Sequence, residues 1–178
     1  PRYNAPVAEL ILDRLPNTLF LVVSGLAVAI VVGVLVGVAM ATWAGRLPDR
    51  ALSLVNLLLY ATPGFCIGLM LILLFSVVPG SLPDNGHATI GVTLAGGDWL
   101  LDRLRYALLP IVTLATFFIA VYGRLTRAAM LEVRQQDFVR TARAKGLAPS
   151  RVMFRHVLRN ALMPITTMAG LHFAALFG

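Results

Sequence analysis

The stretch that decides the fold is residues 18–42, TLFLVVSGLAVAIVVGVLVGVAMAT, which carries no charged side chain over 25 positions. A helix needs about 20 consecutive apolar residues to span the core of a bilayer. The stretch therefore predicts a membrane-spanning helix. The whole composition agrees, because 58% of the 178 residues are hydrophobic and only 13% are charged. Soluble domains carry about 25% charged residues and disordered chains have low hydrophobicity, so both classes are excluded.

Small residues recur at every fourth position along this helix and predict a face that another helix can approach closely. The helix-packing positions are Gly25, Ala29, Gly33, Gly37 and Ala41. Gly64 and Gly68 repeat the same spacing in the next apolar run.

Three further apolar runs predict three more spans, over residues 52–78, 106–123 and 161–178. Pro63 lies near the middle of the first run and predicts a kink there, because proline removes a backbone hydrogen bond. Glycines and prolines between the second and third spans, residues 79–105, predict a loop outside the bilayer.

Charges and apolar residues alternate at helical spacing in residues 1–17, which predicts a short helix on the membrane surface. Asn17 and Thr18 then predict the start of the first span.

The positive charge of the chain is concentrated in one segment. Residues 124–160 hold nine basic and two acidic side chains, so this segment accounts for the whole net charge of +7. Because basic loops near spans mark the cytoplasmic side, we expect residues 43–51 and 124–160 inside the cell. Residues 1–17 and 79–105 are then expected outside.

This basic segment also predicts an elbow of two helices. Residues 135–145 favour a helix, Gly146 is placed to end it, and Pro149 is placed to open the next helix. Arg151, Arg155 and Arg159 recur at four-residue spacing on that second helix. An elbow that projects from membrane helices is suited to docking a partner.

Two sequences in the elbow resemble a known protein family. Residues 137–147, DFVRTARAKGL, and residues 155–164, RHVLRNALMP, are similar to the cytoplasmic loop of permease subunits of binding-protein-dependent ABC importers. The resemblance is to the dipeptide, oligopeptide and nickel branch, and RLPNT at 14–18 and ATPGF at 61–65 also match it. Arg159 stands where the other permease subunit of this branch usually has proline, which favours a B-type subunit.

The resemblance implies an all-α membrane protein, a polytopic helical bundle of the type I ABC importer permease kind. Residues 1–178 are then one transmembrane permease domain with four spans and a cytoplasmic coupling loop, 124–160. Since this branch has six spans, we expect the chain to be a fragment. The residues implied to couple to the ATPase are Arg140, Thr141, Ala142, Arg143, Lys145, Gly146, Leu147 and Arg151.

The implied function is that of a transport subunit and not of an enzyme. Lys145 is the single lysine, and the residue directly after it is glycine and not Ser or Thr, so the sequence lacks the Gly-Lys-[Ser/Thr] of a phosphate-binding loop. We therefore expect ATP and Mg²⁺ on partner subunits. No cofactor is expected on this chain. The implied partners are a C-type permease subunit, two cytoplasmic ATPase subunits, an extracytoplasmic binding protein and membrane lipid, without nucleic acid. The implied location is the bacterial inner membrane, as a multi-pass protein.

Three other classes compete with this function. Binding of nucleic acid or anionic lipid would use the basic residues of 124–160, but these are interleaved with alanines and aliphatic residues at helical spacing, which favours a docking elbow, with some lipid contact still expected. An intramembrane enzyme needs titratable groups at membrane depth, where His172 has no acidic or second His partner in its run. A secondary transporter or channel subunit without ATP coupling remains the alternative, although proton- and sodium-driven carriers usually bury acids and the predicted spans have none. The substrate stays open between dipeptides, oligopeptides, glutathione, nickel and others.

Overall fold

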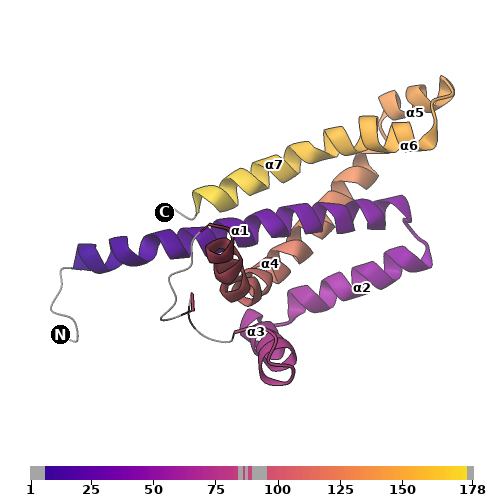
Figure 1. Ribbon diagram of the computed structural model, residues 1–178. Helices are drawn as coiled ribbons and strands as arrows, with labels where there is room; N and C mark the ends of the chain where they lie inside the picture. Colours follow the sequence, from indigo (N-terminus) through magenta and orange to yellow (C-terminus); the bar gives the residue numbers. More distant parts are fainter. Residues whose placement is uncertain (1–6, 84–85, 87, 90–95, 176–178) are drawn as a thin grey trace. The chain divides into compact units, whose positions relative to one another are not determined.

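The regular structure is helical throughout the part of the chain that the structure describes. The computed structural model describes residues 7–83, 86, 88–89 and 96–175 (Figure 1). The prediction of an all-α protein is thus confirmed. The chain divides into two compact units, the first formed by Pro1–Val28 with Gly64–Ala115 and the second by Ala29–Pro63 with Thr116–Gly178.

Helix α1, Val7–Thr42, is one uninterrupted helix of 36 residues. The predicted boundary at Asn17 and Thr18 is therefore wrong, and the described part of residues 1–17 is not a separate surface helix. The Thr18 hydroxyl donates to the Arg14 carbonyl oxygen at 3.1 Å, a bond made inside helices, instead of capping the helix that follows. Residues 1–6 lie outside the described residues.

Helix α2, Leu47–Ala61, ends two residues before Pro63, and helix α3, Gly64–Ile72, begins after it. A π-helical turn, η1 (Leu73–Val77), continues α3. The predicted kink is therefore a complete break. Thr62 has φ −81° and ψ 125°, the extended backbone that the ring of a following proline favours, and its hydroxyl donates to the Leu58 carbonyl at 2.7 Å.

Helix α4, Gly97–Val133, extends beyond the predicted span 106–123 in both directions. The loop predicted for 79–105 is therefore wrong at residues 97–105, and the expected cytoplasmic loop begins as helix. Asp98 lies in the first turn, where a carboxylate is favourable, and Gly96 precedes the helix at φ +63°. Residues 84–85, 87 and 90–95 lie outside the described residues.

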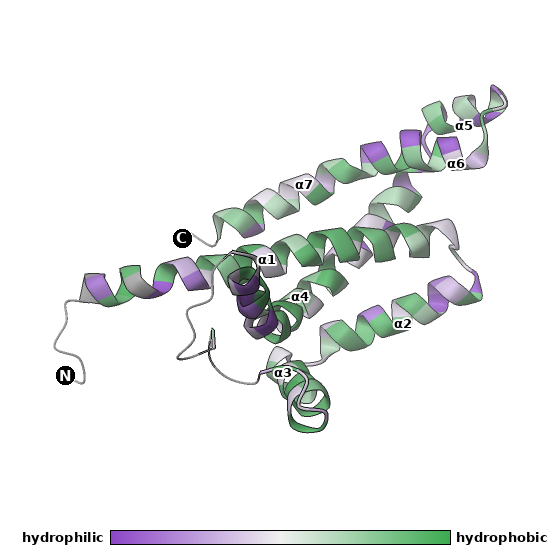
Figure 2. Ribbon diagram, in the orientation of Figure 1, coloured by the Kyte–Doolittle hydropathy of each residue, from purple (hydrophilic) through white to green (hydrophobic). Residues whose placement is uncertain are grey.

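Among the residues that the structure describes, two helices are each long and apolar enough to cross a membrane, Glu9–Thr42 and Gly97–Val133. Leu47–Ala61 and Gly64–Val77 qualify as a third only when taken together. Hydrophobic residues colour most of α1 green, whereas hydrophilic residues gather around α5 and α6 (Figure 2). The fourth predicted span, 161–178, overlaps the last helix, and its crossing of the membrane stays a prediction.

The elbow consists of α5 (Asp137–Ala144), α6 (Pro149–Arg151) and a π-helical segment, η2 (Val152–Leu158), which runs into α7 (Arg159–Ala174). The prediction of two helices separated at Gly146 is confirmed. The π-helical segment was not predicted. Residues 176–178 lie outside the described residues.

The elbow packs on the ends of two long helices within the second unit. Its hydrophobic cluster is formed by Ala41 of α1, by Ala129, Met130 and Val133 of α4, and by Val139, Ala142, Val152, Val157 and Ala161 of the elbow and α7. Val139 and Val157 are completely buried. Apolar burial therefore fixes α5 and η2 directly to the helices from which the elbow projects.

Candidate functional site

In the second unit, the small-residue face of α1 lies against α4. A methyl group added to Gly33 would lie 2.7 Å from the Cβ of Tyr122, and one added to Gly37 would lie 2.7 Å from the carbonyl oxygen of Gly123. These distances are shorter than real Cβ contacts. Two helices can approach this closely only where both residues of α1 lack a side chain. Ala29 and Ala41 on the same face are completely buried.

In the first unit, the corresponding contact is looser. A methyl group on Gly25 of α1 would lie 3.2 Å from the Cβ of Leu114, and one on Gly68 of α3 would lie 3.3 Å from the Cγ2 of Thr113. Gly64 has open space around it. Close approach therefore explains Gly25 and Gly68 in part and does not explain Gly64.

An ion pair between a buried carboxylate and a partly exposed arginine joins the start of α2 to α4 within the second unit. Arg127 donates from Nε to Asp49 Oδ1 and from its NH2 group to Asp49 Oδ2, both at 2.8 Å, and Asp49 is 3% exposed. The Gly45 amide also donates to Asp49, at 2.8 Å. The hydrogen bonds from Arg127 lower the pKa of the Asp49 carboxyl to about 2, against the opposing effect of burial. The sequence analysis gave neither residue a role.

A second arginine ties α4 to the end of α1. Arg134 donates to the Ala41 carbonyl oxygen at 2.9 Å. The last carbonyls of a helix lack partners within the helix, so this bond satisfies one of them. Arg127 and Arg134 together hold the region from which the elbow leaves the long helices.

The outer surface of α5 is formed by only part of the predicted coupling set. Arg140, Thr141 and Arg143 are exposed, whereas Ala142 is 6% exposed and belongs to the buried cluster. Ala142 therefore packs the elbow and does not reach its surface. Phe138, which the sequence analysis did not select, is 40% exposed beside these residues.

The rest of the coupling set lies in the turn between α5 and α6 and at the end of α6. Gly146 has φ +75°, a conformation that residues with a Cβ rarely adopt, and its amide donates to the Arg143 carbonyl at 2.9 Å. Lys145 and Arg151 are exposed, and Leu147 packs partly against the buried cluster. The glycine is thus required by the backbone and not by crowding, since open space surrounds it.

Polar side chains also lie among the long helices of the second unit. The Asn56 side chain is 2% exposed and donates to the Ala120 carbonyl at 2.9 Å. His172 Nδ1 lies 2.9 Å from the Tyr122 hydroxyl. No group of three or more His, Cys, Asp or Glu side chains that could hold a metal ion occurs among the described residues. These bonds are what neighbouring membrane helices use to pair.

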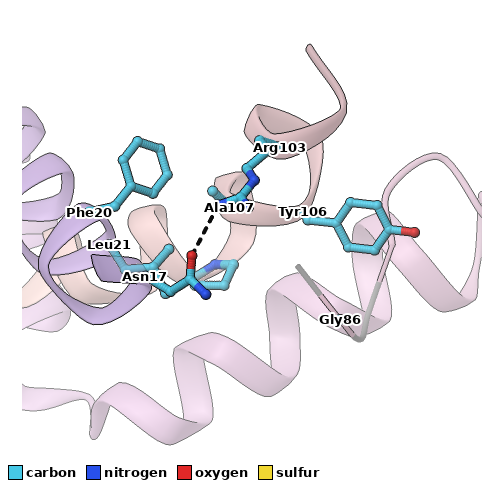
Figure 3. Close-up of a pocket in the computed structure, with 8 residues that line it drawn as sticks. Asn17, Phe20, Leu21, Gly86, Arg103, Tyr106 and Ala107 are labelled. Carbon is cyan, nitrogen blue, oxygen red and sulfur yellow. Dashed lines mark hydrogen bonds between the residues drawn. The ribbon is translucent and has the colours of Figure 1, made fainter. Parts of the chain in front are cut away.

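A small pocket of about 60 Å³ lies in the first unit. Figure 3 shows Arg103 of α4 donating to the Asn17 side-chain oxygen of α1, at 3.0 Å, on the wall of this pocket. The guanidinium also stacks on Trp99, 5.0 Å from the ring centre. The bond links the beginnings of α1 and α4, and the sequence analysis had not anticipated it.

The family of binding-protein-dependent transport system inner membrane components matches residues 33–178. The chain belongs to this family. The match covers the close α1–α4 contact of the second unit, the ion pair and the whole elbow. The resemblance noted in the sequence is therefore confirmed, and this is a membrane component of a transport system and an integral membrane protein.

Relatives of this chain include proteins named for peptide transport. It is 38% identical over 177 residues to the oligopeptide transport system permease protein AppB of Bacillus subtilis, covering 99% of this chain and 55% of AppB. It is 42% identical over 179 residues to the di/tripeptide transport system permease protein DppB of Pseudomonas aeruginosa, covering 93% of this chain and 53% of DppB. It is 37% identical over 173 residues to the glutathione transport system permease protein GsiC of Escherichia coli strain K12, covering 97% and 52%. The chain thus spans about half the length of these relatives.

Proposed function

We propose that this chain is the membrane-spanning part of a permease subunit of an ABC importer that carries a peptide-like substrate or nickel. The observation that carries the proposal is the elbow, which exposes Arg140, Thr141 and Arg143 while its buried side chains pack on α1 and α4. The names of the relatives support a peptide or glutathione substrate.

The proposed partners are those of such an importer. Two cytoplasmic ATPase subunits supply ATP hydrolysis, a C-type permease subunit completes the translocation path, and an extracytoplasmic binding protein delivers the substrate. The proposed location is the bacterial inner membrane, with several spans and the elbow in the cytoplasm. The nine basic residues of 124–160 support that orientation.

The elbow can transmit movement because it is attached rigidly at its base. Val139 and Val157 are completely buried against the long helices, and Arg134 bonds the end of α1. A partner that moves α5 therefore moves α1 and α4 with it, as coupling between a switch element and packed helices requires. No observation favours a transporter or channel without ATP coupling.

The test is to alter the turn of the elbow without removing a contact. Replacing Gly146 with Val forces a β-branched residue into φ +75°, which is a strained conformation, whereas Gly146→Asn keeps a residue that tolerates this region. In the reconstituted importer we expect Gly146→Val to lower transport per ATP hydrolysed by about tenfold or more. Gly146→Asn is expected to stay near the wild-type ratio. Equal ratios for wild type and Gly146→Val would overturn the coupling role.

A second variant tests the outer face directly. Arg140 is exposed on α5, where its side chain lies 3.6 Å from the exposed Asp137 carboxylate, so Arg140→Glu reverses the charge of the docking surface outside the buried cluster. We expect weaker association of the ATPase subunits, measured by co-purification. Unchanged association together with unchanged transport would assign the docking surface elsewhere.

A further inference from the structure

A groove of about 690 Å³ lies where the elbow meets the ends of α1 and α4, and Arg143 of α5 lines it whereas Arg140 and Thr141 do not. It lies wholly within the second unit. Its wall is formed by Thr42 at the end of α1, Arg134 after α4, Arg143 and Leu147 of α5 and its turn, and Pro149, Ser150, Val152, Met153, Phe154 and Val157 of the following helix. The groove therefore opens where the elbow meets the ends of two long helices.

The groove is positively charged. Arg134 and Arg143 contribute guanidinium groups, and no acidic side chain lines it. Arg134 uses one of its two terminal nitrogens on the Ala41 carbonyl, which leaves further donors of that group, and Arg143 makes no side-chain hydrogen bond or ion pair among the described residues. Arginine forks of this kind bind phosphate oxygens in pairs.

The same groove is apolar beside its charges. Phe154 is 58% exposed, and Met153 and Leu147 are only partly covered. A free phosphate or an acidic side chain does not cover such a surface, whereas a lipid does, because it joins a phosphate to acyl chains.

An exposed aromatic residue stands next to a residue that lines the groove. Trp43, 43% exposed, follows Thr42 directly at the end of the first predicted span. Exposed tryptophans at the ends of spans mark the headgroup region of a bilayer. Basic pockets between membrane helices on the cytoplasmic side bind anionic lipid headgroups.

We propose that this groove binds one anionic phospholipid, with its phosphate on Arg134 and Arg143 and an acyl chain along Leu147, Met153 and Phe154. The lipid fills the space between the elbow and the helix ends.

The experiment uses the full-length permease, purified with its partner subunits, stripped of lipid and titrated with phosphatidylglycerol, phosphatidylcholine or inorganic phosphate. Bound lipid is counted by native mass spectrometry. We expect one phosphatidylglycerol per permease, with phosphatidylcholine and inorganic phosphate failing to displace it. Arg143→Gln is expected to weaken binding about tenfold, since it removes a charge-assisted phosphate contact.

Two matched controls separate the groove from the general surface. Arg155→Gln removes an exposed arginine of η2 that does not line the groove, and Phe138→Ser removes an exposed aromatic of α5 outside it. Both are expected to keep wild-type lipid binding, whereas Phe154→Ser is expected to weaken it. Equal losses for Arg143→Gln and Arg155→Gln would overturn the site in favour of nonspecific surface charge.

Two other outcomes would also overturn the proposal. Displacement of the lipid by inorganic phosphate alone would assign the groove to a free anion. Lipid binding that disappears when the ATPase subunits associate would assign the groove to a protein contact. Failure of the coupling role is a separate result, because it is measured as transport per ATP with Gly146 variants and not as bound lipid.

Discussion

The two compact units hold α1 against α4 with different tightness. In the first unit, the contact at Gly25 would leave an added methyl group 3.2 Å from its nearest neighbour. In the second unit, the same addition at Gly33 or Gly37 would overlap Tyr122, Thr126 or the backbone of Gly123. The α1–α4 contact is therefore closest in the unit that also carries the elbow.

The hydrogen bonds between side chains of different helices are also stronger in the second unit. The first unit pairs Arg103 with the neutral oxygen of Asn17 through one hydrogen bond. The second unit pairs Arg127 with the carboxylate of Asp49 through two, in a buried position. Two hydrogen bonds between a guanidinium and a carboxylate are stronger and more directional than a single bond from a guanidinium to a neutral oxygen. Rigidity is thus concentrated beside the elbow, where a mechanical input from a partner would arrive.

The largest expected effect comes from filling the tight contact. Gly37→Leu forces a side chain into the α4 backbone, so we expect a loss of roughly 3 kcal/mol of stability. The measurement is thermal unfolding of the full-length protein in detergent. A smaller loss of stability for Gly37→Leu than for Gly25→Ala would contradict the difference in tightness between the two units.

Breaking the ion pair is expected to have the next largest effect. Asp49→Ala leaves the Arg127 guanidinium unpaired, although this side chain is 33% exposed and water compensates part of the loss. We expect a destabilisation of about 2 kcal/mol. Arg103→Gln in the first unit is the matched variant, and its smaller effect in the same unfolding measurement would sharpen the comparison. An effect of Arg103→Gln equal to or larger than that of Asp49→Ala would refute the difference between the two units.

Lowering the pH should weaken the ion pair between Asp49 and Arg127 without a mutation. Since the folded pKa of Asp49 is about 2 against an ordinary value of 3.8, its stabilisation is fully present above about pH 4 and is lost as the pH falls toward 2. We expect the free energy of unfolding to fall by about 1 kcal/mol over this pH range, after allowance for the exposure of Arg127. Unfolding measured across this range in wild type and Asp49→Asn checks the prediction, because the variant should lack this part of the pH dependence.

The smallest effect is expected at the loose contact. Gly25→Ala places a methyl group against Leu114, but alanine also favours the helix by about 1 kcal/mol relative to glycine. We expect the two effects to cancel to within about 0.5 kcal/mol. A strong destabilisation by Gly25→Ala would show that both units are equally tight.

Much of the fold could be predicted from periodicity and charge. The uncharged run at 18–42 predicted a long apolar helix, and the placement of Gly146 and Pro149 predicted the two helices of the elbow, all of which the structure contains. The helix boundaries were less predictable. Asn17 and Thr18 have the side chains of a helix cap, but Thr18 bonds backward within a continuous helix, and local sequence does not distinguish these two uses.

The candidate site was only partly predictable, because local sequence does not show which side chains the packing of the helices will bury. Arg140 and Ala142 are neighbours in the sequence, yet one is exposed and the other is buried, since the orientation of α5 depends on its packing against α4 and η2. Asp49 and Arg127 are 78 residues apart in the chain, so no local pattern could pair them.

The sequence by itself determined that this is a helical membrane protein with a basic elbow, and its motifs determined the family. Those properties depend on composition, on spacing and on residues close together in the chain. Only the tertiary structure decided that Asp49 meets Arg127, that Ala142 packs inward, and that Arg134 and Arg143 line one groove. These are contacts between distant segments, and the free energy of packing those segments together, and not local preference, selects them.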